Sequence, residues 1–349
     1  MVLFRRIFYL CPCRLSDIDN MKQLLLFLFF SIFAPISAQY SPDLLGDGYE
    51  ARTIQMPDDY EGRVVCTLVK KELEPQNDTH RAILYVHGYN DYFFQSQLGD
   101  SCLAHGYNFY ALDLRKYGRS FLPHQDAFFC KDLKEYFADI DTALVAIHEE
   151  GNREIVFMAH STGGLITSYY LSQRPPETAS ALILNSPFLD WNFGWFMENF
   201  LIPAVSATGR LFPELTVQGE NTSSYARSLL KVFKGEWMFN TDWKMPNGHP
   251  KRAGWIRAIH EAQNYVQKKA NIPCPVLVLS SDRSYPESAA WHDEYLISDI
   301  VLDVNDIQHY GARLGEKVVC RQIPCGMHDL ILSRKEARDE TYRVIFEFL

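Results

Sequence analysis

The residues around Ser161 have the types and spacing expected of a nucleophile. The segment 154–158 is predicted to be a strand, and it leads through Ala159 and His160 to Ser161. Gly163 and Gly164 then open a helical segment. A strand that turns sharply into a helix at a serine resembles the Gly-x-Ser-x-Gly nucleophile elbow, in which the hydroxyl attacks an acyl carbonyl. Ala159 replaces the first glycine of that pattern, and because alanine is nearly as small, the turn remains feasible.

A nucleophilic serine needs a base, and the base needs an orienting acid. His328 is the candidate base because it follows the predicted strand 318–323. Asp299 is the favoured acid, since it gives the chain order Ser, Asp, His. Asp282, which directly follows a strand, and Asp303 remain alternatives, although Asp303 is also suited to capping a helix.

The other histidines suggest structural roles. His160 is expected to point away from Ser161 and pack, His87 to shape its own loop, and His249 to be solvated. None of the 11 histidines occurs in a His-Glu-x-x-His or similar metal-binding spacing. We therefore expect neither a metal nor an organic cofactor.

Strand-like and helix-like segments alternate along the chain, which predicts an α/β fold. Helical periodicity covers 132–150 and 162–173. Several strand segments are continuous apolar runs, as in strands buried on both faces of a parallel sheet. Ligands bind beyond the carboxyl ends of such strands, where Ser161 and His328 are expected to lie. The predicted strands are 63–69, 82–86, 107–112, 154–158, 181–184, 275–279 and 318–323.

The stretch 191–271 interrupts this alternation. It contains no strong strand pattern and holds every tryptophan except Trp291. We interpret it as a helical lid inserted before the last strands, with 39–190 and 272–349 forming the core. Its aromatic side chains would either cover an apolar site or simply pack the helices together.

Residues 1–38 are predicted to be a leader. Met21 and Lys22 precede a short apolar stretch that ends in the small residues Ser37 and Ala38. This is the pattern of a secretory signal peptide cleaved after Ala38, with Met21 as the expected start. The stretch is too short to span a bilayer, so we expect a secreted or periplasmic protein without a stable membrane span. Cys320 and Cys325 would be the first disulfide candidates there.

Composition narrows the range of partners. The 349 residues are 47% hydrophobic and 14% aromatic, which excludes a disordered polymer. A net charge of −9 argues against nucleic acid, because Lys and Arg supply most phosphate-backbone affinity. A small molecule or lipid is the expected substrate.

Taken together, the motifs resemble the α/β-hydrolases of the monoacylglycerol lipase and serine aminopeptidase group, often labelled lysophospholipase-like. The resemblance covers 55–349 and implies the α/β-hydrolase fold: a mostly parallel central sheet flanked by helices, with a helical lid before the last strands. The matching segments are 87–90, 113–120, the turn at Ser161, 298–303 and 326–328.

The resemblance also implies roles for individual residues. The backbone amides of Tyr89 and Thr162 would bind the oxyanion, and the family's acid falls on Asp299. The segment 283–298 before it is longer than usual in the family, which keeps Asp282 open. No cofactor is implied.

The expected function is hydrolysis of carboxylic esters with an apolar acyl part, such as a monoacylglycerol or a lysophospholipid, through a Ser-His-Asp triad. A serine aminopeptidase is the alternative, and it would need lid carboxylates to bind a free amine. A non-catalytic ligand binder is a further alternative. The available lid carboxylates are Glu198, Glu214, Glu220 and Glu236.

Overall fold

The computed structural model describes residues 39–219, 223–288 and 290–349. The predicted leader 1–38, with its cleavage site, lies outside the described residues, as does Glu220. Within the described ranges, no helix combines the length and the apolar character needed to cross a bilayer.

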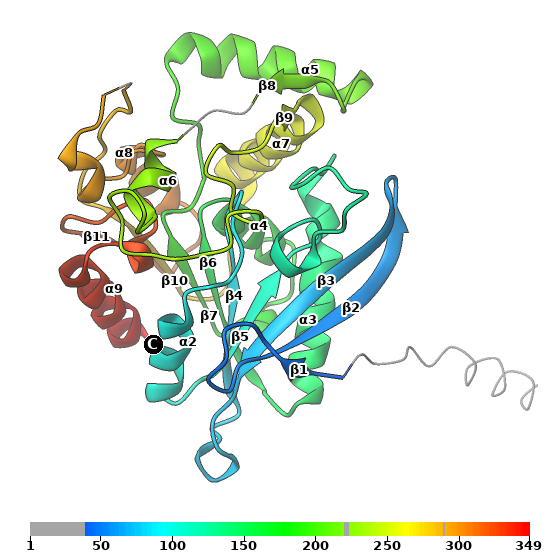
Figure 1. Cartoon of the computed structure of the whole chain (residues 1–349), viewed down its shortest axis with the longest axis vertical. Coiled ribbons are helices and arrows are strands. Elements are labelled where there is room, and N and C mark those ends of the chain that lie inside the picture. Colours follow the sequence, from blue (N-terminus) through cyan, green and yellow to red (C-terminus); the bar gives the residue numbers. More distant parts are fainter. Residues whose placement is uncertain (1–38, 220–222, 289) are drawn as a thin grey trace, which may run out of the picture. The chain divides into compact units, whose positions relative to one another are not determined.

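A nine-stranded sheet forms the centre of the described chain, in the order β1-β2-β3-β5-β4-β6-β7-β10-β11 (Figure 1). The pairs from β5 through β11 are parallel, whereas β1, β2, β3 and β5 pair antiparallel. The predicted α/β class with a mostly parallel sheet is therefore confirmed. The strands are β1 (Ser41–Pro42), β2 (Glu50–Asp59), β3 (Gly62–Lys71), β4 (Arg81–Val86), β5 (Asn108–Asp113), β6 (Glu154–His160), β7 (Ala181–Asn185), β10 (Val276–Ser281) and β11 (Val318–Ile323).

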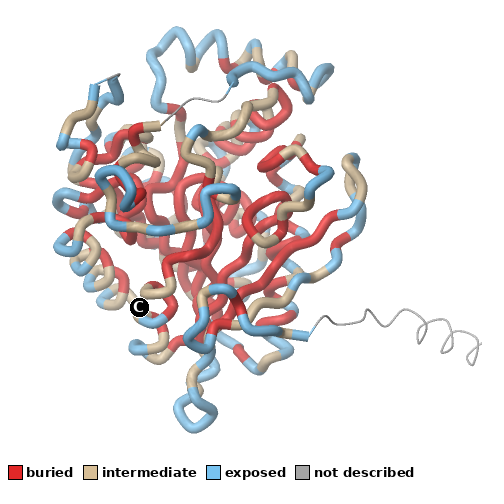
Figure 2. Tube along the Cα trace, in the orientation of Figure 1, coloured by how far each residue is buried: buried red, intermediate tan, exposed pale blue. Residues whose placement is uncertain are grey.

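Helices cover both faces of the sheet. Side chains of α3 (Phe137–Glu149), α4 (Thr162–Leu171) and α7 (Ala253–Lys269) pack with one set of strand residues. Those of α2 (Ser96–Ala104) and α9 (Lys335–Phe348) pack with the alternate set. Strands such as β4 thus bury both faces, which explains their continuous apolar sequences. Figure 2 shows this buried centre.

The other helices are short or lie at the ends of the strands. Helix α8 (Val304–Gly311) precedes β11 and contacts β10. The single turns of 3-10 helix are η1 (Pro75–Asn77), η2 (Gly118–Ser120), η3 (Leu133–Tyr136), η4 (Pro176–Thr178), η6 (Asp293–Leu296) and η7 (Leu330–Leu332).

The chain between β7 and β10, residues 186–275, is here called the insert. It contains a π-helical turn η5 (Met197–Leu201), α5 (Ile202–Leu211), α6 (Ser224–Leu229) and α7. It also contains a small antiparallel sheet of β8 (Thr216–Gln218) and β9 (Lys251–Arg252), which the sequence did not predict. Helix α5 packs on α7, and α7 packs on α4 of the core.

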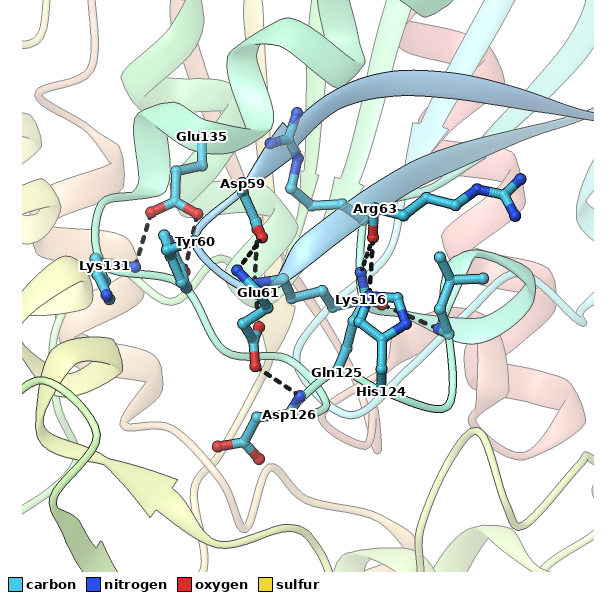
Figure 3. Close-up of polar contacts among 12 residues, drawn as sticks. Asp59, Tyr60, Glu61, Arg63, Lys116, His124, Gln125, Asp126, Lys131 and Glu135 are labelled. Atoms are coloured by element: carbon cyan, nitrogen blue, oxygen red, sulfur yellow. Dashed lines mark hydrogen bonds and ion pairs between the residues drawn. The ribbon is translucent and has the colours of Figure 1, made fainter.

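The tip of the β2–β3 hairpin is fastened to the loop that follows β5 (Figure 3). The ammonium of Lys116 is fully buried, lies 2.8 Å from Asp59 Oδ2 and also pairs with the Glu61 carboxylate. Glu61 in turn accepts a hydrogen bond from the backbone N–H of Asp126 at 2.9 Å. These contacts fix the position at which the loop presents the Asp126 side chain.

Asp126 connects this loop to the insert. Its carboxylate lies 2.7 Å from His249 Nε2 and 2.5 Å from Arg252 Nε. The prediction that His249 is solvated is therefore wrong, because the imidazole has a carboxylate partner from a distant loop. Pro250 and Lys251 lie between these two contacts in the sequence, so the backbone of Lys251 is anchored on both sides.

Cys320 and Cys325, the first candidates for a disulfide, are free thiols in the structure. All six cysteines in the described part of the chain are free thiols, and four of them are buried in the core.

Candidate active site

Ser161 occupies a strained turn between β6 and α4. Its φ of 51° and ψ of −117° lie in a region that non-glycine residues rarely adopt. The neighbouring glycines explain how the backbones approach so closely. A Cβ on Gly88 would lie 3.0 Å from the Cβ of Ser161, and one on Gly163 would collide with the carbonyls of Val86 and His87. Ala159 fits within β6 and leaves this turn intact.

The structure brings Ser161, His328 and Asp299 into one hydrogen-bonded chain. Ser161 Oγ lies 3.0 Å from His328 Nε2, and His328 Nδ1 lies 2.9 Å from Asp299 Oδ2. The three residues are 8%, 2% and 0% exposed. Because a carboxylate only accepts hydrogen bonds, Nδ1 must carry the proton, and the Nε2 of a neutral imidazole is free to accept from the serine hydroxyl.

Asp299 reaches His328 because the segment between Ser284 and Asp299 forms a loop whose two ends pair. A β-bridge joins Ser284 to Asp299, so that Asp299 returns to the end of β10 although 14 residues intervene in the sequence. Its second oxygen, Oδ1, accepts hydrogen bonds from the backbone N–H groups of Val301 and Leu302 at 2.8 Å each. The carboxylate is thereby held with Oδ2 towards the imidazole.

The two alternative acids have other partners. Asp282 accepts hydrogen bonds from the Arg283 guanidinium at 2.6 Å and from the backbone N–H of Cys325 at 3.0 Å. Burial alone would raise the pKa of Asp282, but these hydrogen bonds outweigh it and lower the pKa. Asp303 caps α8 by accepting from the Asn305 N–H. Neither carboxylate contacts His328 within the described structure.

Tyr89 and Thr162, the predicted oxyanion donors, both line the cavity that contains Ser161. Thr162 is the first residue of α4, so its N–H has no acceptor within the helix. His87 shapes the loop that carries Tyr89: its Nδ1 bonds the Gly88 carbonyl at 2.8 Å, and its Nε2 accepts from the Leu114 N–H at 3.1 Å. This is the structural role that the sequence suggested for His87.

A cavity of about 290 Å³ opens in front of Ser161. Its apolar wall includes Phe188, Trp191, Phe193 and Trp255, all four from the insert. The remaining tryptophans of the insert lie elsewhere. Trp237 and Trp243 pack against a separate cluster around Tyr92, and Trp195 is 69% exposed. Only part of the aromatic content of 191–271 therefore surrounds the site.

His328 is held between two rings. The His160 ring lies 4.8 Å from it and the Tyr225 ring 5.5 Å, the latter edge to face. Burial lowers the pKa of His160. Its Nδ1 bonds the carbonyl of Asn185, so His160 packs as predicted. It does not turn away from the site, however, because it lines the cavity that contains Ser161 and lies next to His328.

Asn185 and Asp329 form a buried frame behind these residues that sequence reasoning missed. The Asn185 amide donates to Asp329 Oδ1 at 2.7 Å and accepts from the Leu330 N–H at 3.1 Å. Its backbone carbonyl accepts from the Ser161 N–H at 3.0 Å. Two features of the sequence could have indicated these residues: Asn185 is the last residue of a strand, and Asp329 directly follows His328.

One group of possible metal ligands lies next to this frame. Ligand atoms of Asp91, His160 and Asp329 lie within 4.8 Å of one another, and all three residues are buried. The Lys244 ammonium already lies 2.8 Å from Asp91 Oδ1. A metal ion there is therefore not needed to neutralise Asp91, and it would be repelled by the lysine.

Comparison with solved structures supports the fold. A monoacylglycerol lipase from Paleococcus ferrophilus is 17% identical, with a TM-score of 0.59 over 80% of this chain and 96% of that chain. A soluble variant of monoglyceride lipase from Saccharomyces cerevisiae is 14% identical, with a TM-score of 0.62 over 90% and 97%. A thermostable carboxyl esterase from Bacillus coagulans is 14% identical, with a TM-score of 0.57 over 85% and 97%.

Comparison of sequences gives the family. No curated protein matches the sequence significantly. Residues 77–285 match the family described as "Serine aminopeptidase, S33", which is more than half of the chain. The chain therefore belongs to the serine aminopeptidase S33 family and has the α/β-hydrolase fold.

Proposed function

We propose that the protein is a serine hydrolase that cleaves carboxylic esters with an apolar acyl part. The observation that carries this proposal is the hydrogen-bonded chain Ser161–His328–Asp299, which ends in a largely apolar cavity. The family match and the similar structures of two monoacylglycerol lipases and an esterase support a lipase-like hydrolase.

In the proposed reaction, His328 Nε2 takes the Ser161 proton as Oγ attacks the ester carbonyl. The Tyr89 and Thr162 amides donate hydrogen bonds to the resulting oxyanion. The bond from the carbonyl carbon to the alkoxy oxygen then breaks, and His328 protonates the leaving alcohol. Water, activated by the same imidazole, releases the acid from the acyl-enzyme. Asp299 keeps the proton on Nδ1 and stabilises the imidazolium.

The cavity favours esters over peptides. A serine aminopeptidase would need an unpaired carboxylate near Ser161 for the substrate amine. The predicted lid carboxylates that are described lie elsewhere: Glu198 bonds the Phe193 N–H, Glu236 pairs with Arg334, and Glu214 is exposed. The carboxylate that does line the cavity, Asp91, is paired with Lys244.

The dimensions and surroundings of the cavity favour a short or medium acyl chain. Its volume of about 290 Å³ is at the low end of small-molecule sites, which span roughly 300–1,000 Å³. Just after the cavity residue Phe193 in the sequence, Trp195 and Phe196, which precede η5, and Phe200 of η5 are 54–69% exposed. An exposed apolar surface of this kind next to the site suits an amphiphilic, lipid-like substrate.

A fluorophosphonate reagent tests the central assignment. Wild-type protein should be labelled, Ser161→Ala should not, and Ser206→Ala should be labelled as wild type because Ser206 is buried in α5 away from the cavity. A panel of p-nitrophenyl esters of graded length, compared with amino-acid p-nitroanilides, then separates esterase from aminopeptidase. Failure to label wild type would favour the non-catalytic binder.

Export through the leader is part of the proposal. Cell fractionation of the full chain should place the mature protein outside the cytoplasm, with its amino terminus at Gln39. An intact leader on cytoplasmic protein would contradict this.

A further inference from the structure

Lys251 is a charged residue in the wall of the active-site cavity. It belongs to β9 of the insert and lines the same space as Ser161, Tyr89 and Trp255. Its side chain is partly buried, and its ammonium lies 5.9 Å from the centre of the Tyr89 ring. The Lys251 side chain therefore forms part of the wall of the space that the proposed acyl or alcohol part of a substrate would occupy.

Lys251 has no anionic partner among the described residues, although carboxylates lie nearby. Asp91, which also lines the cavity, is 2.8 Å from Lys244. Asp126, on the loop behind β9, is occupied by His249 and Arg252. Burial alone would raise the pKa of Asp126, but these two partners outweigh it and lower the pKa.

The position of Lys251 is fixed by the residues beside it. Arg252 and His249 are held by Asp126, and Lys251 itself pairs with Gln218 of β8. Because the Asp126 loop is fastened to the β2–β3 hairpin, the backbone of Lys251 is anchored to the core. The fold therefore holds the backbone that carries this unpaired ammonium group at the cavity wall.

An unpaired ammonium group in a partly buried cavity wall is energetically unfavourable unless an anion binds next to it. Desolvation lowers the pKa of Lys251, and no carboxylate opposes that shift. The residues that line the cavity include one aspartate, Asp91, and two lysines, Lys244 and Lys251. The charged side chains of the wall therefore carry one positive charge in excess. A bound anion would restore the balance and form a charge-assisted hydrogen bond.

We propose that Lys251 forms an anion subsite of the active-site cavity, which binds the carboxylate or phosphate group of an ester substrate. This inference rests on the proposed ester hydrolysis and narrows its substrate class to esters that carry an anionic oxygen group. Lys251 is then a specificity-determining residue that contacts substrate and takes no part in proton transfer.

Two matched substrate pairs test the subsite and distinguish the two anions. The first pair is p-nitrophenyl pentanoate and mono-p-nitrophenyl glutarate, in which a carboxylate replaces a terminal methyl group. The second pair is 1-octanoylglycerol and its 3-phosphate, assayed by release of octanoate. The measured quantity is the ratio of kcat/KM for the anionic ester to that for the neutral ester, which cancels any general loss of activity.

Three variants accompany the wild type. In Lys251→Met, the ratio should fall by about tenfold to a hundredfold in at least one pair, as expected for loss of a hydrogen bond to a charged group. Lys251→Arg should retain most of the preference. Lys231→Met removes an exposed lysine of the insert outside the cavity and should leave the ratio at its wild-type value. An unchanged ratio in both pairs for Lys251→Met would overturn the subsite.

A binding measurement separates this inference from the proposed reaction. Isothermal titration of hexanoate into Ser161→Ala and into Ser161→Ala/Lys251→Met needs no catalysis, and the double variant should bind it at least tenfold more weakly. If no ester is cleaved but this difference persists, the hydrolase proposal fails and the subsite stands. Equal affinity in the two proteins would overturn the subsite even in an active enzyme.

Discussion

Replacing Asp299 by asparagine should abolish most activity through the tautomer of His328. Asp299 Oδ1 accepts two backbone hydrogen bonds of 2.8 Å, from Val301 and Leu302. In Asp299→Asn, only the amide oxygen is able to accept those bonds. The amide nitrogen must then face His328 Nδ1, where it donates a hydrogen bond and drives the imidazole proton to Nε2. An Nε2–H group is unable to take the Ser161 proton.

The expected loss in kcat is about 10⁴-fold, the size found when this change imposes the wrong tautomer on a serine-protease triad. At about 1.36 kcal/mol per tenfold change, that corresponds to about 5.4 kcal/mol in the activation barrier. The assay is hydrolysis of a short p-nitrophenyl ester, with thermal unfolding as a check that the variant remains folded.

Asp303→Asn is the matched control, because asparagine caps a helix about as well as aspartate and should preserve near-wild-type kcat. Asp282→Asn should likewise retain most of its kcat, since that carboxylate binds Arg283 and the Cys325 N–H and does not contact His328. The reasoning is refuted if Asp299→Asn keeps more than about a tenth of wild-type kcat while Asp282→Asn loses the 10⁴-fold expected of the triad acid.

Three further predictions follow from the packing around the triad. Gly88→Ala would place a methyl group 3.0 Å from the Ser161 Cβ, and we expect kcat in the ester assay to fall at least tenfold while the circular dichroism spectrum is unchanged. Asn185→Leu removes both partners of the buried Asp329–Leu330 turn, which should lower the free energy of unfolding in urea by about 2–4 kcal/mol; a change under about 0.5 kcal/mol would contradict this role. Because burial lowers the pKa of His160 in the folded chain, protons bind the unfolded chain preferentially, so stability should fall as pH drops below about 6.5. Urea titrations at pH 7.5 and 5.5 should show a smaller loss for His160→Gln than for wild type.

The sheet was predictable because its central strands are buried on both faces. All seven predicted strands are present, since runs such as that of β4 leave few alternatives. Strand β2, which pairs with the two-residue edge strand β1, was missed because Met56 is its only buried residue and its sequence is largely polar. The two-residue strand β9 has no pattern long enough to predict.

Ser161 and His328, the proposed nucleophile and base, were also placed by local signals, since each follows a strand that ends at the same edge of the sheet. The position of Asp299 beside His328 depends on the β-bridge with Ser284, and no sequence pattern predicts that bridge. Lys251 and Tyr225 come from the insert, where contacts are made across long sequence separations. Nothing local distinguished Lys251 from an ordinary surface lysine.

Two sets of contacts fasten one part of the insert to the core. Asn90 exchanges hydrogen bonds with the backbone of Met245 at 2.8 Å in each direction, and Asp126 holds His249 and Arg252. The residues from 245 to 252 are therefore clamped to the core. By contrast, α5 reaches the core through its packing on α7 in the described structure, and much of η5 and α5 is exposed (Figures 1 and 2).

We therefore expect that η5 and α5 are exchangeable as one segment. Under the proposed function, the exposed aromatic side chains around η5 would meet an approaching substrate, whereas Lys251 in the clamped part would contact its anionic group. Chain-length preference and headgroup preference would then depend on separate stretches of sequence. Exchanging η5 and α5 for those of another hydrolase should alter the first property and leave the second with this chain.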